Sequence, residues 1–226
     1  MKILEVKAES KPSRILIGEK LARLEAYIDK KNTIILTDTN ILRHYREQLP
    51  DGVPLIEMGL GEKHKTLETI SMIMGRLLEL EADRSSFLLA IGGGIVCDVG
   101  GFAASIYMRG IRFGFVSTTL LSQVDASVGG KNGVNYEGFK NMVGVFNQPE
   151  FVLCDNEMFR TLDAAQFRSG FAEIIKAGAI KDAALFGYCN NNASAALDND
   201  SGTITHMVYE SVKIKAHVVE ADEREK

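Results

Sequence analysis

The feature that most constrains the fold is a short apolar run, Phe87–Ile91, that leads directly into three consecutive glycines, Gly92–Gly94. The residues that follow, Val96–Ile106, have the apolar periodicity of a helix. A strand, a glycine turn and a helix are typical of open α/β sheets in which backbone amides bind a pyrophosphate at the helix N-terminus. The spacing is not G-x-G-x-x-G, so an ordinary Rossmann fingerprint is excluded, and a tight structural turn is the alternative interpretation.

Short apolar runs alternate with helical patterns over the first two thirds of the chain. The runs predicted as strands are Arg14–Ile17, Thr33–Thr37, Val53–Met58, Phe87–Ile91, Gly114–Ser117 and Phe151–Cys154. Helical patterns lie between several of them, at Leu42–Gln48, Thr66–Leu80 and Val96–Ile106. This alternation predicts a mostly parallel sheet that is covered on both faces.

The strand signal ends near residue 155, and helical patterns follow at Ala164–Ala179, Ala183–Asn190 and Thr203–Val219. We therefore predict an α/β fold, with a Rossmann-like, mostly parallel sheet domain over residues 1–155 and the beginning of an all-helical domain over 156–226. The polar segment Asn190–Gly202 is predicted to be an exposed loop or a frayed helix end. The final amphipathic pattern reaches Lys226 without a Gly or Pro terminator, so we expect the chain to stop inside the second domain.

Composition excludes several classes of function. A net charge of −4 gives no support to a nucleic-acid partner. No run of about 18 apolar residues is present, so no membrane span is expected. The three cysteines are widely spaced and form no C-x-x-C, which argues against a disulfide framework or a cysteine zinc site. Because the N-terminus also lacks a signal-peptide pattern, we expect a cytoplasmic protein.

Three further segments place polar side chains near the ends of predicted strands, at Thr37–Asn40, Gly61–Lys65 and Thr118–Thr119. An acidic residue in the first position can bind ribose hydroxyls, although Asp, Thr and Asn are also common helix N-caps. Glu62 and Lys65 reach the same cofactor in one interpretation and lie in solvent at a helix start in the other. Thr118 and Thr119 supply hydroxyls at a neighbouring strand end.

Basic residues and glycines are concentrated just after these segments. Lys131 follows two glycines, Lys140 precedes Asn141, and Arg109 precedes a glycine. Such cations can neutralise a phosphate, while the alternative for each one is a solvated surface charge. No G-x-x-x-x-G-K-[ST] is present, so a Walker A loop is excluded. The density of the cluster favours a site for a phosphate-bearing ligand.

Glu173 and Lys176 are three residues apart on a predicted helix and therefore share a face. The glutamate is a candidate metal ligand on a rigid element, and the alternative is a surface ion pair. No H-E-x-x-H is present, and the histidines are interpreted as surface residues.

Taken together, these residues resemble the 3-dehydroquinate synthase family of sugar phosphate cyclases. The most specific segments are GGGIVCDVGGFAAS, MRG, STTLLSQVDASVGGKNGVN, GFKNMVGVFNQP and SGFAEIIKAG. The resemblance implies conversion of 3-deoxy-D-arabino-heptulosonate 7-phosphate to 3-dehydroquinate and phosphate, the second step of the shikimate pathway. It also implies catalytic NAD, a divalent metal (zinc or cobalt), a sugar phosphate substrate and a homodimer.

Site residues follow from the resemblance position by position. The residues expected to bind NAD are Asp38, Asn40, Glu62, Lys65, Gly93, Gly94, Asp98, Thr118, Thr119, Leu121, Asp125, Lys131, Lys140, Thr161 and Leu162. The residues expected to act on the substrate are Arg109, Asp125, Lys131, Lys140, Asn141, Lys176, Lys215 and Glu225, with Arg109 reaching it across the dimer interface. The metal ligand is Glu173.

The chain departs from the family pattern at two points. Ser117 stands where the family usually has Pro, a change we expect to be tolerated. The family's two histidine metal ligands lie further along, and His206 and His217 do not match them. We therefore expect residues 1–226 alone to be inactive. The alternatives are another cyclase that makes an inosose or a valiolone, a polyol dehydrogenase, or a non-catalytic NAD-binding fragment.

Overall fold

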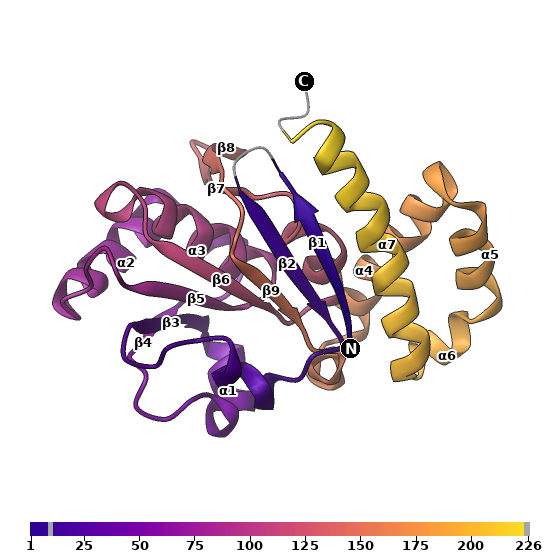
Figure 1. The fold of residues 1–226 in the computed structure, drawn as a ribbon, viewed down its shortest axis with the longest axis horizontal. Helices are drawn as coiled ribbons and strands as arrows, with labels where there is room; N and C mark the ends of the chain where they lie inside the picture. The colour runs from indigo at the N-terminus through magenta and orange to yellow at the C-terminus, as the bar shows by residue number, and fades with distance from the viewer. Residues whose placement is uncertain (9–10, 224–226) are drawn as a thin grey trace.

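The computed structural model describes residues 1–8 and 11–223, and its largest element is a seven-stranded sheet (Figure 1). The strand order is β1-β2-β9-β6-β5-β3-β4. The strands are β1 (Lys2–Lys7), β2 (Pro12–Ile17), β3 (Thr33–Asp38), β4 (Leu55–Met58), β5 (Phe87–Gly92), β6 (Arg112–Ser117) and β9 (Phe151–Cys154). All neighbours are parallel except β1 and β2. The predicted mostly parallel sheet is confirmed, and every predicted strand is present.

Burial explains which strands the sequence revealed. All residues of β5 and β9 are buried, because helices or 3-10 turns cover both faces of the central sheet. The edge strand β1, in contrast, buries only Val6, so its sequence lacks an apolar run and was not predicted. Its register against β2 is antiparallel, from Lys2 opposite Ile17 to Lys7 opposite Pro12.

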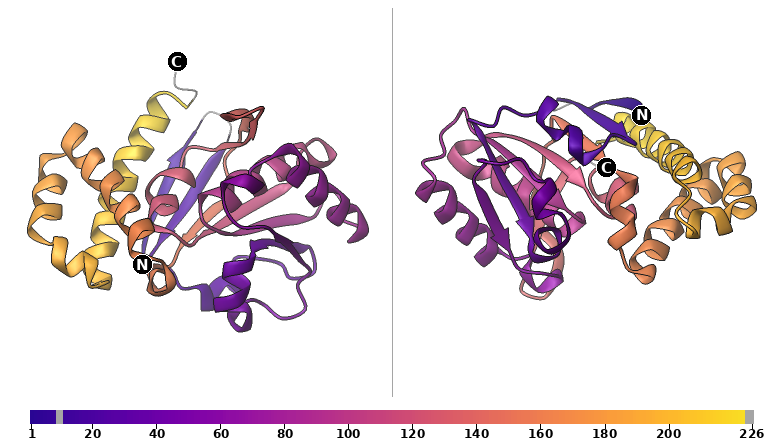
Figure 2. Two further views of the ribbon diagram at one scale, coloured as in Figure 1. Left: turned by 180° about the vertical axis from the view of Figure 1, so that it is seen from behind. Right: turned by 90° about the horizontal axis from the view of Figure 1, so that it is seen from below.

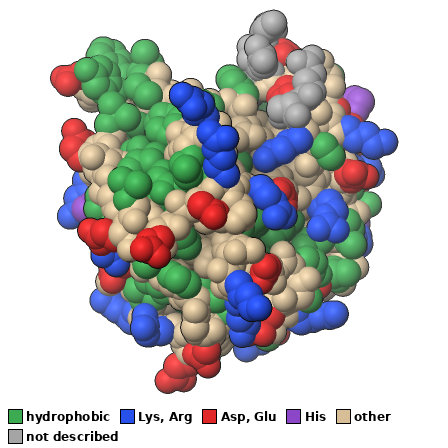
Figure 3. All heavy atoms as spheres, turned by 60° about the vertical axis from the view of Figure 1, so that its left-hand side comes forward, with side chains coloured by type: hydrophobic (Ala, Val, Ile, Leu, Met, Phe, Trp, Pro, Cys, Tyr) green, Lys and Arg blue, Asp and Glu red, His purple; other side chains and the backbone are tan. Residues whose placement is uncertain are grey.

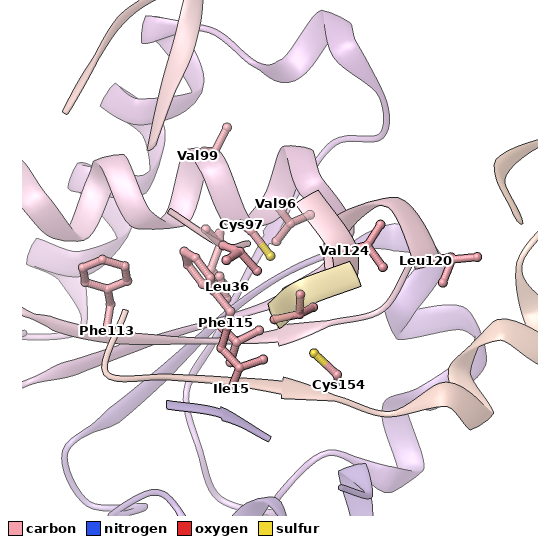
Figure 4. Packing of buried hydrophobic residues seen from close by; sticks show 14 of the residues in the cluster. Ile15, Leu36, Val96, Cys97, Val99, Phe113, Phe115, Leu120, Val124 and Cys154 are labelled. Atoms are coloured by element: carbon pink, nitrogen blue, oxygen red, sulfur yellow. The ribbon is translucent and has the colours of Figure 1, made fainter. Parts of the chain in front are cut away.

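Helices cover the two faces of the sheet unequally. One face carries α2 (Leu67–Glu79) and α3 (Gly94–Ile106), and the other carries α1 (Thr39–Tyr45) with the 3-10 helices η1 (Leu21–Ala26) and η2 (Arg46–Gln48). Figure 4 shows the first core, where Cys97 of α3 lies above side chains of the sheet such as Leu36 and Phe115. The helix N-cap bonds agree with the sequence, since Thr66 accepts a bond from Thr69 N at the start of α2.

A hairpin stands apart from the main sheet and was not predicted. Its strands β7 (Lys131–Tyr136) and β8 (Phe139–Phe146) are antiparallel, with an irregularity between Val134 and Tyr136. Gly133 lies opposite Gly144, where an added Cβ on either residue would clash with the backbone of the other strand. The glycines and polar residues of this segment hid the strand pattern, because alternation of apolar and polar residues is weak here.

The residues after β9 are helical, as predicted. They form η6 (Asn156–Thr161), α4 (Ala164–Lys181), α5 (Ala183–Asn191), α6 (Ala193–Leu197) and α7 (Ser201–Ala221), which lie beside the β1 edge of the sheet (Figures 1 and 2). The prediction of a loop over Asn190–Gly202 was partly wrong, because this segment contains α6. The short helix buries Ala196 and packs on α7, while its polar side chains remain exposed.

Among the described residues, no helix combines the length and the apolar composition that crossing a membrane requires. The three cysteines, Cys97, Cys154 and Cys189, are buried and unpaired. Burial raises the pKa of the Cys97 thiol well above its usual value, so this side chain behaves as a small apolar core residue.

Candidate active site

A cavity of about 730 Å³ lies beyond the carboxyl ends of β3, β4, β5 and β6. This is the position at which open parallel sheets bind ligands. The predicted cofactor residues that line it are Asp38, Asn40, Glu62, Gly93, Gly94, Thr118, Thr119, Leu121, Thr161 and Leu162. Residues from segments far apart in the sequence, including the start of the helical region, therefore converge on one cavity.

The glycine turn forms one wall of this cavity, at the N-terminus of α3. Gly93 is the N-cap of the helix, has an extended backbone and offers no side chain to cap the first amides. A Cβ on Gly93 would lie 3.0 Å from Thr119, and a Cβ on Gly94 would lie 3.0 Å from Ala126. The turn is therefore packed tightly on one side, and its helix terminus is suited to bind an anion.

Asp38 is a helix N-cap, one of the two interpretations that the sequence allowed, and it also lies at the cavity. Its carboxylate accepts a hydrogen bond from Ile41 N at 3.0 Å and so caps α1. The residue also lines the cavity, and burial raises the pKa of its carboxyl group. The same side chain can therefore cap the helix and face a ligand.

A π-helical turn, η5 (Ser122–Ala126), packs directly against the glycine turn, where Gly94 adjoins Ala126. It is closed by the bond from Ser127 N to Ser122 O at 3.0 Å, which spans five residues. Ser117 is fully buried, and its hydroxyl shares a bond with Ser122 Oγ at 2.5 Å. The buried hydroxyl of Ser117 thus has a partner in this turn, and π-helical turns are frequent at functional sites.

A second cavity, of about 490 Å³, adjoins η5 and the hairpin. Its charged lining residues are Asp98, Asp125, Lys131 and Lys215. Lys215 Nζ of α7 lies 2.7 Å from Asp125 Oδ1 of η5, so the helical region contributes a cation to this cavity. Charges of both signs therefore face a space large enough for a small polar molecule.

Lys65 binds two side chains that line the second cavity. Its ammonium group donates to Asp98 Oδ2 at 2.5 Å and to Asn141 Oδ1 at 2.6 Å, and the residue is only 6% exposed. Burial raises the pKa of the Asp98 carboxyl group to about 6, against the opposing effect of the Lys65 ammonium. Lys65 is not among the residues lining the first cavity, and its partners are the side chains of the second.

Other predicted substrate residues lie outside both cavities. Arg109 is exposed at the end of α3 opposite the glycine turn, in η4 (Tyr107–Arg109), where Met108 and Arg109 have φ values of 49° and 68°. Lys140 is exposed on β8, and Lys176 is exposed on α4. Glu225 lies outside the described residues. In this arrangement, the side chains of Arg109, Lys140 and Lys176 do not join the cavities.

The described residues do not form a metal site. Glu173 makes an ion pair with Lys176, and no group of three or more His, Cys, Asp or Glu side chains suited to a metal occurs within residues 1–8 and 11–223. His206 instead contacts the ring of Tyr188, with 4.3 Å between the ring centroids. Glu173 alone therefore does not make a donor set for zinc, which usually has three protein ligands in catalytic sites.

Sequence reasoning missed several residues of the site. Tyr45, His44, Gln166 and Ser169 line the first cavity, and the Tyr45 hydroxyl shares a bond with Thr161 Oγ1 at 2.8 Å. His44 lies four residues after Asn40 on α1, a spacing that places both on one helix face and that the sequence already contained.

A mostly parallel sheet with a glycine turn at its carboxyl edge and an adjoining charged cavity defines an open-sheet α/β protein with two cavities near one edge of the sheet. The chain belongs to the 3-dehydroquinate synthase family. The family's N-terminal model matches residues 55–169, and its C-terminal model matches residues 170–226.

Curated relatives carry the same family name. The chain is 43% identical to 3-dehydroquinate synthase of Pelotomaculum thermopropionicum over 202 residues, covering 86% of this chain and 54% of that protein. It is 38% identical to the Dictyoglomus thermophilum enzyme over 231 residues, covering 100% of this chain and 64% of that protein. The chain thus spans between about half and two thirds of the length of these relatives.

Solved structures with the same fold include two cyclases. One is 2-epi-5-epi-valiolone synthase from Streptomyces hygroscopicus with NAD⁺ and Zn²⁺ bound, at a TM-score of 0.86 and 26% identity. The other is 2-deoxy-scyllo-inosose synthase with carbaglucose-6-phosphate, NAD⁺ and Co²⁺, at a TM-score of 0.83 and 25% identity. Each match covers 100% of this chain, with 64% of the first protein and 65% of the second.

Proposed function

We propose that this chain is the cofactor-binding region and part of the helical region of a 3-dehydroquinate synthase. The reaction would convert 3-deoxy-D-arabino-heptulosonate 7-phosphate to 3-dehydroquinate and phosphate. The observation that carries the proposal is the pair of cavities whose linings meet where Gly94 packs against Ala126, the first with a glycine turn and the second with Lys131 and Lys215. The curated relatives, at 38–43% identity, support the choice of reaction.

NAD is the cofactor that fits the first cavity. Gly93 and Gly94 leave the amides of α3 accessible to the pyrophosphate, and Asp38 and Asn40 would contact the adenosine end. The valiolone and inosose synthase structures hold NAD⁺, which supports this assignment. When bound, NAD supplies a hydride acceptor that returns the hydride later in the cycle, so it is not consumed.

The sugar phosphate would occupy the second cavity. Lys131 and Lys215 would bind its anionic groups, and Asn141 would donate to or accept from its hydroxyls. Asp125 already holds Lys215, so the ion pair would orient the cation toward the substrate. Binding energy in this cavity would place the reacting carbon next to the cofactor cavity.

A divalent metal is proposed only because the chain belongs to this family. The described residues do not fit a zinc or cobalt ion, because no group of three or more candidate ligands occurs among them. We propose that Glu173 is one ligand and that the remaining family ligands follow Lys226.

We also propose a homodimer. Exposed apolar side chains occur on the hairpin and at the end of α3, and Figure 3 shows hydrophobic side chains gathered on one face. The exposed apolar residues of these two segments are Ile106, Met108, Tyr136, Phe139, Met142 and Phe146. Arg109 adjoins them and lies outside both cavities, so a second copy would bring it to a site. Light scattering on Phe139→Ser, compared with Phe186→Ser on α5, should show weakened association for the first variant alone.

The second candidate is another cyclase, because the two structures described above act in inosose and valiolone synthesis by their names. The full-length protein should be incubated with NAD, zinc and the heptulosonate phosphate. Phosphate release without accumulation of NADH would support the proposed reaction. NADH accumulation would indicate a polyol dehydrogenase. Phosphate release from glucose 6-phosphate or sedoheptulose 7-phosphate, and not from the heptulosonate phosphate, would indicate another cyclase.

A further inference from the structure

Asn135 lies on β7 at the irregularity between the strand pairs Val134–Val143 and Tyr136–Phe139. Between these pairs, one residue on β7 stands against three on β8. A bulge of this kind redirects a side chain and is frequent beside active sites. Asn135 is half-buried, and the hydrogen bonds of its carboxamide lie at the surface of the molecule.

The polar groups of Asn135 are bonded to three different residues. Its backbone N donates to Lys65 O at 2.9 Å, and its Nδ2 donates to Glu62 Oε1 at 2.9 Å. Its Oδ1 accepts from Asn141 N at 2.9 Å. Glu62 lines the first cavity and Asn141 lines the second, so one carboxamide connects the borders of both.

Asn141 needs such support because of its backbone. Its φ of 55° lies in the left-handed region, which asparagine tolerates better than most residues but which still costs free energy. Asn135 Oδ1 fixes its amide, and Lys65 Nζ fixes its side chain at 2.6 Å. The two bonds together set the direction of Asn141 in the second cavity.

We propose that Asn135 is a positioning residue that holds Glu62 for the cofactor and Asn141 for the substrate, and so couples the two cavities. The identity of the ligands rests on the proposed function. The geometry requires a donor and an acceptor on one short side chain, and a carboxamide supplies both. Aspartate at this position keeps the acceptor for Asn141 and loses the donor to Glu62, which it also repels.

The test uses the full-length enzyme with Asn135→Asp and Asn135→Ala. Calorimetry gives the Kd of NAD, and phosphate release gives kcat and the KM of the heptulosonate phosphate. The alanine variant should raise the Kd of NAD and the KM of the heptulosonate phosphate about threefold to tenfold each, because each loses the effect of one hydrogen bond. The aspartate variant should raise the Kd of NAD by at least as much and leave the KM within about twofold.

Amide hydrogen exchange of Asn141 provides a readout that does not depend on activity. Exchange should accelerate in Asn135→Ala and stay slow in Asn135→Asp. The matched control is Asn147→Asp, which removes a hydrogen bond between the hairpin and Ser105 without touching Glu62 or Asn141. It should leave both constants and the exchange rate close to those of the unmodified enzyme.

Equal effects of Asp and Ala at position 135 on both constants and on exchange would overturn the proposal. The proposal would also be overturned if Asn147→Asp raised the Kd of NAD, the KM and the exchange rate of Asn141 as Asn135→Ala does, since that result indicates a general loosening of the hairpin. If the unmodified enzyme releases no phosphate, the proposed function fails. The NAD affinities and the exchange of Asn141 then still decide the role of Asn135.

Discussion

Lys215 of α7 and Asp125 of η5 form an ion pair at 2.7 Å although 90 positions separate them in the sequence. The pair connects the last described helix to the η5 wall of the second cavity. Both side chains are partly exposed, at 25% and 42%, so the pair alone adds little stability. Its importance is therefore geometric, because it sets where a cation of the helical region meets the second cavity.

Replacing Lys215 with Met should raise the KM for the heptulosonate phosphate in the full-length enzyme by tenfold or more. The substitution removes a cation and leaves Asp125 without its partner in a cavity that would hold an anion. Thermal unfolding should change by only a few degrees, since the pair is exposed. Lys213→Met, on the outer face of α7, is the matched control and should leave the KM unchanged.

Replacing Gly94 with Val should abolish NAD binding. A Cβ at this position already lies 3.0 Å from Ala126, and the branched side chain would block approach to the amides of α3. Calorimetry on residues 1–226 is sufficient for the measurement. Gly75→Val on α2, where nothing lies within 4 Å of an added Cβ, controls for loss of helix propensity. Equal NAD affinity in both variants would refute the assignment of the glycine turn.

The Asp98 carboxyl group should titrate near pH 6, which carbon NMR of labelled protein can follow. Its folded-state pKa of about 6 lies above that of the unfolded chain, because burial outweighs the Lys65 ammonium. The folded state therefore binds more protons between about pH 4 and 6, and the stability linked to this group falls as pH rises through that range. Lys65→Met should raise the pKa further, and an unchanged titration would contradict the assigned cause.

Replacing Lys131 with Met should lower turnover of the full-length enzyme by about a hundredfold, since preorganised charges of this kind are typically worth a few kcal/mol. Lys131 lines the second cavity, where negative charge of the substrate would gather. Lys181→Met, at the exposed end of α4, provides the comparison. Turnover within about threefold of the unmodified enzyme would show that Lys131 does not contact the substrate.

A protein limited to residues 1–226 should bind NAD yet contain no stoichiometric zinc and release no phosphate. Glu173 is paired with Lys176, and one carboxylate holds zinc weakly. Plasma emission of this protein and of the full-length protein measures the metal directly. Stoichiometric zinc in the shorter protein that is lost in Glu173→Gln would show that other described residues complete the site.

The sheet was predictable because its central strands are short, continuous apolar runs. The edge strand β1 was not, since it buries only Val6, and the hairpin was not, since Gly133 and Gly144 interrupt its pattern. The site was predictable where residues follow strand ends, as at Asp38 and Thr118. The site was less predictable where it depends on contacts between segments that are distant in the sequence, because the spacing of residues does not indicate which segments meet.

Asn135 illustrates this limit. Asn135 is the last residue of the motif STTLLSQVDASVGGKNGVN. Its proposed role nevertheless depends on Glu62 and Asn141, which lie 73 and 6 residues away in the sequence. Arg109 illustrates the opposite case, because its motif was specific and yet the described fold leaves it outside both cavities.

The turn η5 has a consequence for how its aspartate can vary. The bond from Ser127 N to Ser122 O encloses one residue more than an α-helical turn does. Deleting a single residue there would restore ordinary winding and rotate Asp125 by roughly 100° about the helix axis, away from α7. The count of residues in the turn thus determines the direction of the carboxylate as firmly as its chemical identity does, and a relative with a shorter turn would keep the aspartate but lose its partner.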